Sequence, residues 1–201
     1  MIENTYESRY LTAIVGIGTG QNGDGPAVYT TLSGHRMTAN ISAYGGETQG
    51  QATVKIYGMS QHLMNQLTNI GPIQWQIRGK NSLQILAGTN PNALSTIYNG
   101  TIQSAFADYN TAPDVGFEIT AMSATVAAMQ PVDATSTPLN VPVSVEQLMR
   151  NFAIKAGLSW GENVDVNVIL TNVTFNGSVL DQIKSCAETA KIDYTIENFT
   201  L

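Results

Sequence analysis

Hydrophobic and polar residues alternate through several short segments in the first two thirds of the chain. Residues 37–44 place Met37, Ala39 and Ile41 on one face and polar side chains on the other, and residues 52–57 repeat this pattern. The same two-residue period recurs in four later segments, at 73–78, 81–88, 99–110 and 115–124. Such alternation is typical of antiparallel strands with one covered face, and its regular spacing predicts a β-sandwich or a β-barrel.

A short helix interrupts this series directly after the strand predicted at 52–57. Ser60 suits the N-cap position, because its hydroxyl can accept a hydrogen bond from a backbone N–H of the first turn. Leu63, Met64 and Leu67 then form an apolar stripe over about two helical turns. A helix this short is marginal on its own. We therefore expect Leu63 and Leu67 to pack on the sheet or to close one end of a barrel.

Two aromatic residues occupy inward-facing positions of the predicted strands. Trp75 lies in the segment IQWQIR, and Phe117 lies in VGFEITAMSA between apolar neighbours two residues away on each side. Aromatic side chains bury a large apolar area, so we expect both in the core of the first domain.

The chain changes character at residues 130–143, where Pro131, Pro138 and Pro142 disfavour helix and remove backbone donors. We expect a linker there, between a β domain at 1–129 and a small domain at 144–201. In the small domain, Ser144 with Gln147 and Ser178 with Asp181 match the capping-box spacing that starts a helix. Strands are predicted at VDVNVIL, 164–170, and at KIDYTIE, 191–197. The expected fold is therefore α+β, with an antiparallel β-barrel or sandwich carrying one short helix, followed by an α-β-α-β domain.

Charged residues make up only 12% of the 201 residues, and the net charge is −6. The usual charged share is about 25%, so much of the surface must be built from Thr, Asn, Ser and Gln. Neutral polar side chains lose less on desolvation than charges do, which favours a surface that takes part in assembly. No cluster of Lys and Arg forms the basic footprint of a protein that grips nucleic acid.

The candidate motifs for chemistry are weak. Residues 18–23 match G-x-G-x-x-G, but Asp-Gly-Pro follows where a dinucleotide site needs a helix, so a loop between strands is expected. Cys186 is the only cysteine and lies on a predicted helix, where a buried thiol is expected. His62 lacks a second ligand four residues away. We expect no catalytic residues, no cofactor and no metal site. The enzyme alternative, a carbohydrate-active β protein, requires two carboxyl groups about 5–10 Å apart in a cleft.

The N-terminal segment MIENTYESRY has no apolar signal core, and no apolar run approaches the length of a membrane span. We therefore expect the chain to be made and folded in a host cytoplasm without inserting into a membrane.

Three segments together resemble baseplate hub proteins of contractile-tailed bacteriophages. ISAYGGETQGQATVKIYGMSQHLMNQL resembles the early part of that family, in which a strand ends in a Gly step and a Ser-capped helix follows. YNGTIQSAFADYNTAPDVGFEITA is similar to the family's next pair of strands, and SVEQLMRNFAIKAGL with FNGSVLDQIKSCAETA is similar to the helix pair of its second domain.

The resemblance implies a β-barrel of the tail-tube type and a structural role in the virion. Family hubs form a trimeric ring that joins the sixfold tail tube to the threefold central spike. The implied partners are further copies of the chain, the tail tube protein, the spike protein and the tape measure protein, with DNA passing through the lumen. Family members supply two barrel domains and this sequence shows one, so the final strand pattern IDYTIENFTL is expected to be an edge that more chain or a partner covers.

Two related functions stay open beside this one. The chain could be a sixfold tail tube or distal tail component, or the hub of a non-viral contractile injection device. Three copies in the particle would indicate a hub, and six copies would indicate a tail tube or distal tail component. Neighbouring capsid genes would distinguish a phage protein from the hub of a non-viral device.

Overall fold

The computed structural model describes residues 8–19, 25–43, 50–68, 81–110, 112–123, 125, 132–162 and 165–201. The chain divides into two compact units. Unit 1 comprises Met1–Ile41 and Ala52–Ala121, and unit 2 comprises Ser42–Gln51 and Met122–Leu201. Each unit has its own hydrophobic core.

The described part of unit 1 is built on a seven-stranded sheet with the order β2-β1-β5-β6-β7-β4-β3. Its strands are β1 (Tyr10–Gly18), β2 (Ala27–Leu32), β3 (Met37–Ser42), β4 (Gln51–Tyr57), β5 (Ser82–Gly88), β6 (Ser95–Asp108) and β7 (Gly116–Met122). The registers of β1 with β2, of β1 with β5 and of β5 with β6 are all antiparallel. The antiparallel strands that the alternation predicts are therefore confirmed for most of the sheet.

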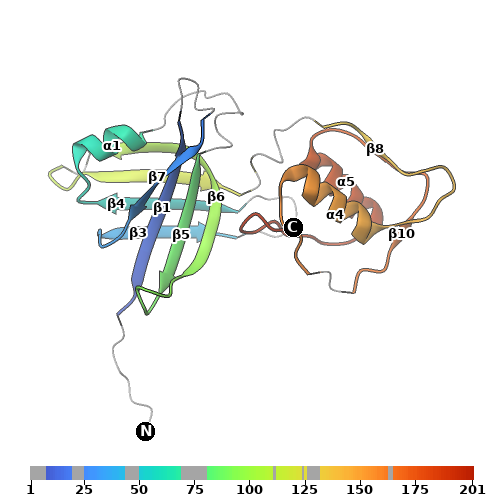
Figure 1. The fold of residues 1–201 in the computed structure, drawn as a ribbon, viewed down its shortest axis with the longest axis horizontal. Helices are drawn as coiled ribbons and strands as arrows, with labels where there is room; N and C mark the ends of the chain where they lie inside the picture. The colour runs from blue at the N-terminus through green and yellow to red at the C-terminus, as the bar shows by residue number, and fades with distance from the viewer. Residues whose placement is uncertain are drawn as a thin grey trace, which may run out of the picture. The chain divides into compact units, whose positions relative to one another are not determined.

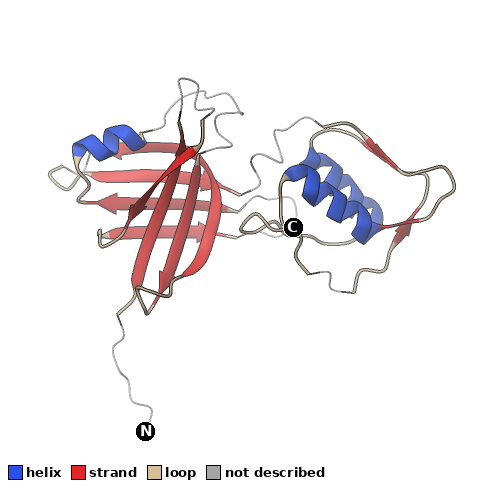
Figure 2. Cartoon of the chain, in the orientation of Figure 1, coloured by secondary structure: helices blue, strands red, loops and turns tan. Residues whose placement is uncertain are grey.

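This sheet folds over on itself around its longest strand. In Figures 1 and 2, β1 and β5 run steeply while β3, β4 and β7 lie almost at right angles to them, and β6 curves between the two groups. A register shift between Ile85 and Leu86 marks a bulge in the pairing of β5 with β6. Bulges bend a strand and increase its twist. A bend near the start of β6 fits a strand that runs from one group to the other.

The expected closed barrel is wrong, because β2 and β3 end the strand order and no ladder joins them in the described residues. Alternation reports which face of a strand is buried. It carries no information about whether the first and last strands meet, so it predicted the covered face correctly and could not predict closure.

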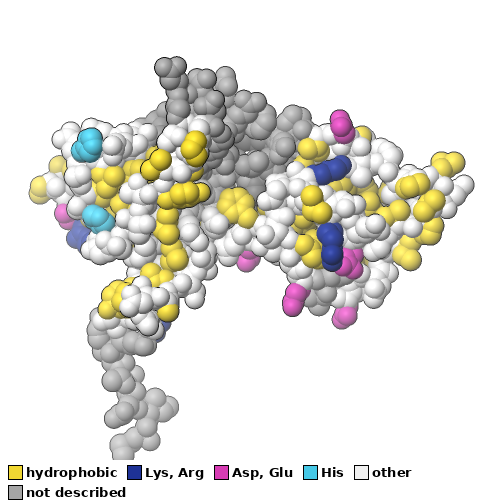
Figure 3. Space-filling view, viewed as in Figure 1, with side chains coloured by type: hydrophobic (Ala, Val, Ile, Leu, Met, Phe, Trp, Pro, Cys, Tyr) yellow, Lys and Arg dark blue, Asp and Glu magenta, His cyan; other side chains and the backbone are white. Residues whose placement is uncertain are grey.

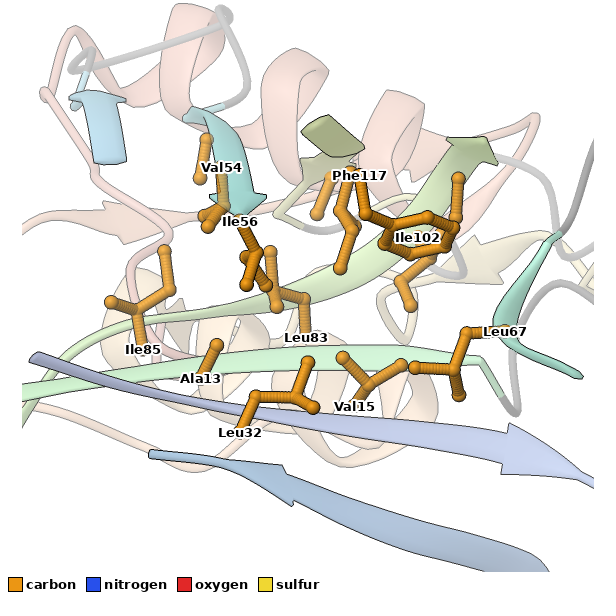
Figure 4. Packing of buried hydrophobic residues seen from close by; sticks show 14 of the residues in the cluster. Ala13, Val15, Leu32, Val54, Ile56, Leu67, Leu83, Ile85, Ile102 and Phe117 are labelled. Atoms are coloured by element: carbon orange, nitrogen blue, oxygen red, sulfur yellow. The ribbon is translucent and has the colours of Figure 1, made fainter. Parts of the chain in front are cut away.

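The core of unit 1 lies between the two groups of strands (Figure 4). Residues from six strands and one helix contribute fully or nearly fully buried side chains: Ala13, Val15, Leu32, Val54, Ile56, Leu67, Leu83, Ile85, Ile102 and Phe117. Phe117 has no exposed surface. Two-sided burial of this kind resembles the interior of a sandwich of crossed sheets.

Helix α1 (Gln61–Leu67) begins where β4 ends. Gly58 has a φ of 77°, a conformation that glycine adopts without strain, and it turns the chain out of the strand. The Ser60 hydroxyl accepts a hydrogen bond from the Leu63 backbone N–H at 3.3 Å. Met64 and Leu67 are buried in the core, and Leu63 packs against it. The helix is therefore held by its apolar stripe and by a capped first turn.

Unit 2 packs two helices against a broken antiparallel ribbon. Its elements are β8 (Thr135–Ser136), β9 (Val143–Ser144), α4 (Val145–Ala156), β10 (Ile169–Leu170), β11 (Thr174–Phe175) and α5 (Val179–Ala190). β8 pairs with β11, and β9 pairs with β10. Phe152 of α4 meets Phe175 of β11 edge-to-face at 5.8 Å between ring centroids, a favoured aromatic geometry at the centre of this core.

The expected α-β-α-β order of this unit holds in part. Of the strand predicted at 164–170, Ile169 and Leu170 form β10, Val166 and Val168 pack on the core, and Val164 lies outside the described residues. Residues 192–196 form no strand. The alternation of the final segment did report its covered face, because Ile192, Tyr194 and Ile196 all belong to or pack on the core. A strand also needs a neighbouring backbone, which a single segment's pattern cannot reveal.

The Pro-rich segment 130–143, expected as a linker, contains β8 and the start of β9. The Thr137 backbone N–H donates to the Val173 carbonyl at 2.9 Å, which continues the pairing beyond β8. Proline removes a donor only at its own position, so the residues between the prolines still form hydrogen bonds across the ribbon.

Leu67→Asp is expected to lower the free energy of unfolding by at least about 3 kcal/mol, because it combines the loss of a buried leucine with an unpaired buried charge. Leu67 is only 4% exposed. Gln66→Asp is the matched control, since Gln66 is its exposed neighbour on the same helix and should change stability little. Chemical denaturation of both variants measures the difference. Equal stability of the two would contradict the packing of α1 on the sheet.

Candidate assembly surface

The titratable side chains of the described residues form no metal-binding group. No group of three or more His, Cys, Asp or Glu residues that could hold a metal occurs among them. The His35 ring nitrogen lies 3.2 Å from the Tyr57 carbonyl, and His62 is exposed on α1. Cys186 is fully buried, and this burial raises the pKa of its thiol to about 11. The thiol is thus neutral and inert at physiological pH.

The glycine-rich segment after β1 does not lead into a helix. β2 begins at Ala27, and Thr19 meets Pro26 through two hydrogen bonds, from its backbone N–H at 3.2 Å and from its hydroxyl at 2.8 Å. Gly20 to Asp24 lie outside the described residues. A dinucleotide site needs a helix whose N-terminus faces the pyrophosphate, and a strand stands in that place here.

Several charged residues of unit 1 pair around strands β4 and β6. Lys55 and Asp108 form a hydrogen-bonded ion pair at 2.6 Å, with the side chains only 23% and 16% exposed. This hydrogen bond raises the pKa of Lys55 and lowers that of Asp108. Arg36 pairs with Asp114 at 2.7 Å, and its guanidinium lies 4.2 Å from the centre of the Tyr57 ring. These four charged residues pair within unit 1.

The neighbouring strands β2, β1, β5 and β6 carry almost no charge. Across these four strands, Asp108 at the very end of β6 is the one charged residue. Residues directly opposite each other in a ladder share a face. The registers therefore place Ile14 beside Thr31 and Gln84, on the face that points away from the core.

Apolar side chains run along this outer face, and Figure 3 shows them as a stripe down the β half of the molecule. Tyr29 is 65% exposed, Tyr10 42% and Ile97 42%. Tyr29 lies across Gly16, where an added Cβ would stand only 2.8 Å from its ring. The absence of a side chain at Gly16 therefore lets the aromatic ring lie flat on the sheet. The outer face mixes such apolar groups with neutral polar ones.

The two edge strands lack the usual protection against pairing. β2 (AVYTTL) and β3 (MTANIS) are each six residues long and contain no charge and no proline. Proteins that stay monomeric commonly place Lys, Pro or a bulge on an edge strand to prevent pairing with other chains. The unprotected edges and the uncharged outer face together form a surface suited to assembly. We call strands β2, β1, β5 and β6 with edge strand β3 the assembly surface.

The residues singled out from the sequence support local structure. Ser60 caps α1, and Leu63, Leu67 and Phe117 contribute to the core of unit 1. Trp75 lies outside the described residues.

The two serines predicted to start the helices of unit 2 differ in the structure. Ser178 forms the full capping box with Asp181, and the Ser178 hydrogen bonds lower the pKa of that carboxyl. Ser144 occupies the N-cap position without a side-chain hydrogen bond, so the capping box predicted there is wrong. The Val145 backbone N–H, the first of the helix, donates to the Val168 carbonyl of the ribbon at 2.9 Å.

Sequence reasoning missed the assembly surface itself. The two-residue period identifies the buried positions of a strand. On the other face it shows only that the residues are neutral and polar. The signal that could have located it is the lack of charge, since residues 10–19 and 81–107 contain none. The low charge of the whole chain does not by itself show which segments lack charged residues.

The chain matches the family model described as baseplate hub gp41 over residues 18–201. This match covers most of the chain, so the chain belongs to the baseplate hub gp41 family. Membership supports a structural role in a phage baseplate and a location in the virion tail. No curated protein matches the chain.

Solved structures match the chain over most of its length. One is the 43 kDa tail protein of prophage MuSo2 from Shewanella oneidensis, with a TM-score of 0.60, 12% identity and 96% of this chain covered. The chain spans 51% of that tail protein, about half its length. A Francisella PdpA-VgrG complex matches at a TM-score of 0.45 and 13% identity, over 88% of this chain and 24% of that one. Identities this low describe similarity of fold. Among the helices that the structure describes, none is long and apolar enough to cross a membrane.

Ser178→Ala is expected to lower the free energy of unfolding by about 1 kcal/mol, the usual cost of losing an N-cap hydrogen bond. Ser144→Ala is the matched control, because its hydroxyl makes no such bond and its loss should cost little. Thermal or chemical unfolding of the two variants checks the contrast. A larger loss for Ser144→Ala than for Ser178→Ala would contradict the capping assignment.

Proposed function

We propose that this chain is a structural hub or adaptor of the baseplate, which joins the sixfold tail tube to the threefold central spike. The observation that carries the proposal is the match to the baseplate hub family over residues 18–201. The proposal also includes two parts of the sequence-based expectation. These are a division between two domains at residues 130–143 and a first domain of the tail-tube type.

The assembly surface supplies a physical route to a ring of copies. An edge strand presents a row of backbone N–H and C=O groups that can pair with another strand. β2 and β3 lie at opposite ends of one strand order, so copies that pair edge to edge extend the sheet in one direction. Such head-to-tail contacts generate a closed ring when the rotation between copies closes. A trimer is the ring that a threefold spike requires.

Low charge favours such contacts. Stable protein interfaces bury about 1,600 Å² in total, and their cores are depleted of charged residues. A chain with a net charge of −6 repels its copies wherever acidic groups meet. The uncharged face of β2, β1, β5 and β6 avoids this repulsion.

The charge balance also suits a channel that DNA crosses. Excess acidic groups repel phosphate, so DNA would pass without condensing on the wall. We infer that acidic residues face the lumen, and that the tail tube, the spike and the tape measure protein are the neighbours of the ring.

A cryo-EM reconstruction of the particle tests this proposal through the copy number at the chain's position. Three copies between the tail tube and the spike are expected, because the hub must match the threefold spike. Six copies would make the chain a tail tube or distal tail component. The chain would be the hub of a non-viral contractile device if it were absent from a phage tail and its gene lay beside genes of an injection device, without capsid genes.

A further inference from the structure

Three asparagines of the chain are followed directly by glycine, at residues 22–23, 99–100 and 176–177. In this dipeptide the backbone nitrogen of the glycine can attack the side-chain carbonyl carbon of the asparagine and close a succinimide ring. Glycine favours the attack, because it has no Cβ to crowd the nitrogen and its backbone rotates most freely. The first pair lies outside the described residues, and the structure describes the other two.

The pair Asn99–Gly100 lies inside the sheet of unit 1. Both residues belong to β6 and are paired with β5, Asn99 with Gln84 and Gly100 with Leu83. Gly100 is also buried. Ring closure would have to rotate this backbone out of the ladder and remove the amide proton of a buried glycine. A central strand permits this only when it opens, so the sheet protects Asn99.

The pair Asn176–Gly177 lies in the short connection between β11 and α5. Neither residue belongs to a helix or a strand, and both are exposed. Gly177 has a φ of 97°, a conformation that a residue with a side chain rarely adopts. A Cβ at this position would also stand 2.8 Å from Oδ2 of Asp181. The connection therefore requires glycine here, and this requirement places the reactive dipeptide where solvent reaches it.

We propose that Asn176 is a site of spontaneous deamidation in the folded chain. The Gly177 backbone nitrogen loses its proton and bonds to Cγ of Asn176, the bond from Cγ to Nδ2 breaks, and ammonia leaves with that proton. Water then opens the succinimide at either carbonyl carbon. One opening gives aspartate, and the other gives isoaspartate, in which the main chain runs through the former side chain. Water is the only co-reactant.

Isoaspartate would lengthen a backbone that is fixed on both sides. On one side Phe175 is buried, and its ring meets the Phe152 ring edge-to-face. On the other side Nε2 of Gln182 donates to the Gly177 carbonyl at 3.2 Å, and Ser178 forms the capping box of α5. The extra main-chain carbon lies between these anchors, so one of them has to shift.

The side chain of Gln182 makes this connection sensitive to such a shift. Gln182 is fully buried, and its Nε2 also donates to the Asp133 carbonyl at 3.1 Å. Its Oε1 accepts a hydrogen bond from Oγ1 of Thr135, in β8, at 2.7 Å. Movement of Gly177 takes one partner from a buried amide, which destabilises the fold. Conversion of Asn176 to isoaspartate is therefore expected to weaken unit 2.

The experiment incubates the full folded chain at mildly alkaline pH and follows each asparagine by tandem mass spectrometry of proteolytic peptides. Asn99 controls for the dipeptide, because glycine follows it within the ladder. Asn92 controls for exposure, because it is exposed in the turn after β5 but precedes Ala93. Asn176 is expected to convert at least about tenfold faster than either control. In concentrated urea, Asn99 should convert as fast as Asn176.

A second measurement follows the melting temperature during the same incubation. Asn176→Gln keeps an amide at this exposed position, but its longer side chain would have to close a larger ring, which forms far more slowly. The melting temperature of the unchanged chain should fall by about 2–4 °C as isoaspartate accumulates. That of Asn176→Gln should stay constant.

Conversion of Asn99 or Asn92 as fast as Asn176 in the folded chain would overturn the proposal. It would also be overturned if Asn176 stayed unmodified in the folded chain and converted in urea. A constant melting temperature after conversion, or an equal fall for Asn176→Gln, would contradict the weakening of unit 2. The copy number in the particle is not affected by any of these results, so the hub assignment is tested separately.

Discussion

The structure depends on how one antiparallel sheet encloses its core. The two groups of strands cross over buried residues such as Val15, Ile56 and Phe117, and the long strand β6 connects the groups. This arrangement removes apolar area from water without a ladder between β2 and β3 in the described residues. Within the described residues, β2 and β3 are therefore the two edges of the sheet. Burial determines the fold of unit 1, and the edges that it leaves determine what the unit can assemble with.

The proposed function rests on surfaces of the described residues and not on reactive groups. The buried thiol of Cys186 is held neutral, and the Lys55–Asp108 pair is satisfied within the chain. The outer face of β2, β1, β5 and β6 carries neutral polar and apolar groups. Uncharged contacts of this kind let many copies of an acidic protein meet without mutual repulsion.

The sequence predicted local structure best where one residue type has one physical role. Ser60, Ser178 and the Leu67 stripe behave as expected, because capping and helical periodicity depend on neighbours close in sequence. Ser144 differs, because it occupies the N-cap position without a side-chain hydrogen bond. The segment 191–197 differs because alternation reports a covered face and says nothing of a partner strand. Barrel closure is a property of the whole sheet, so no single segment could reveal it.

The central claim is that the edges of the sheet become paired when copies assemble, and amide hydrogen exchange tests it most directly. Exchange in β2 and β3 would be compared between the isolated chain and the assembled particle, with the central strand β5 as the internal reference. The account predicts fast exchange at both edges in the isolated chain and strong protection in the particle, while β5 stays protected in both. Equal exchange of β2 and β3 in the two states would contradict it.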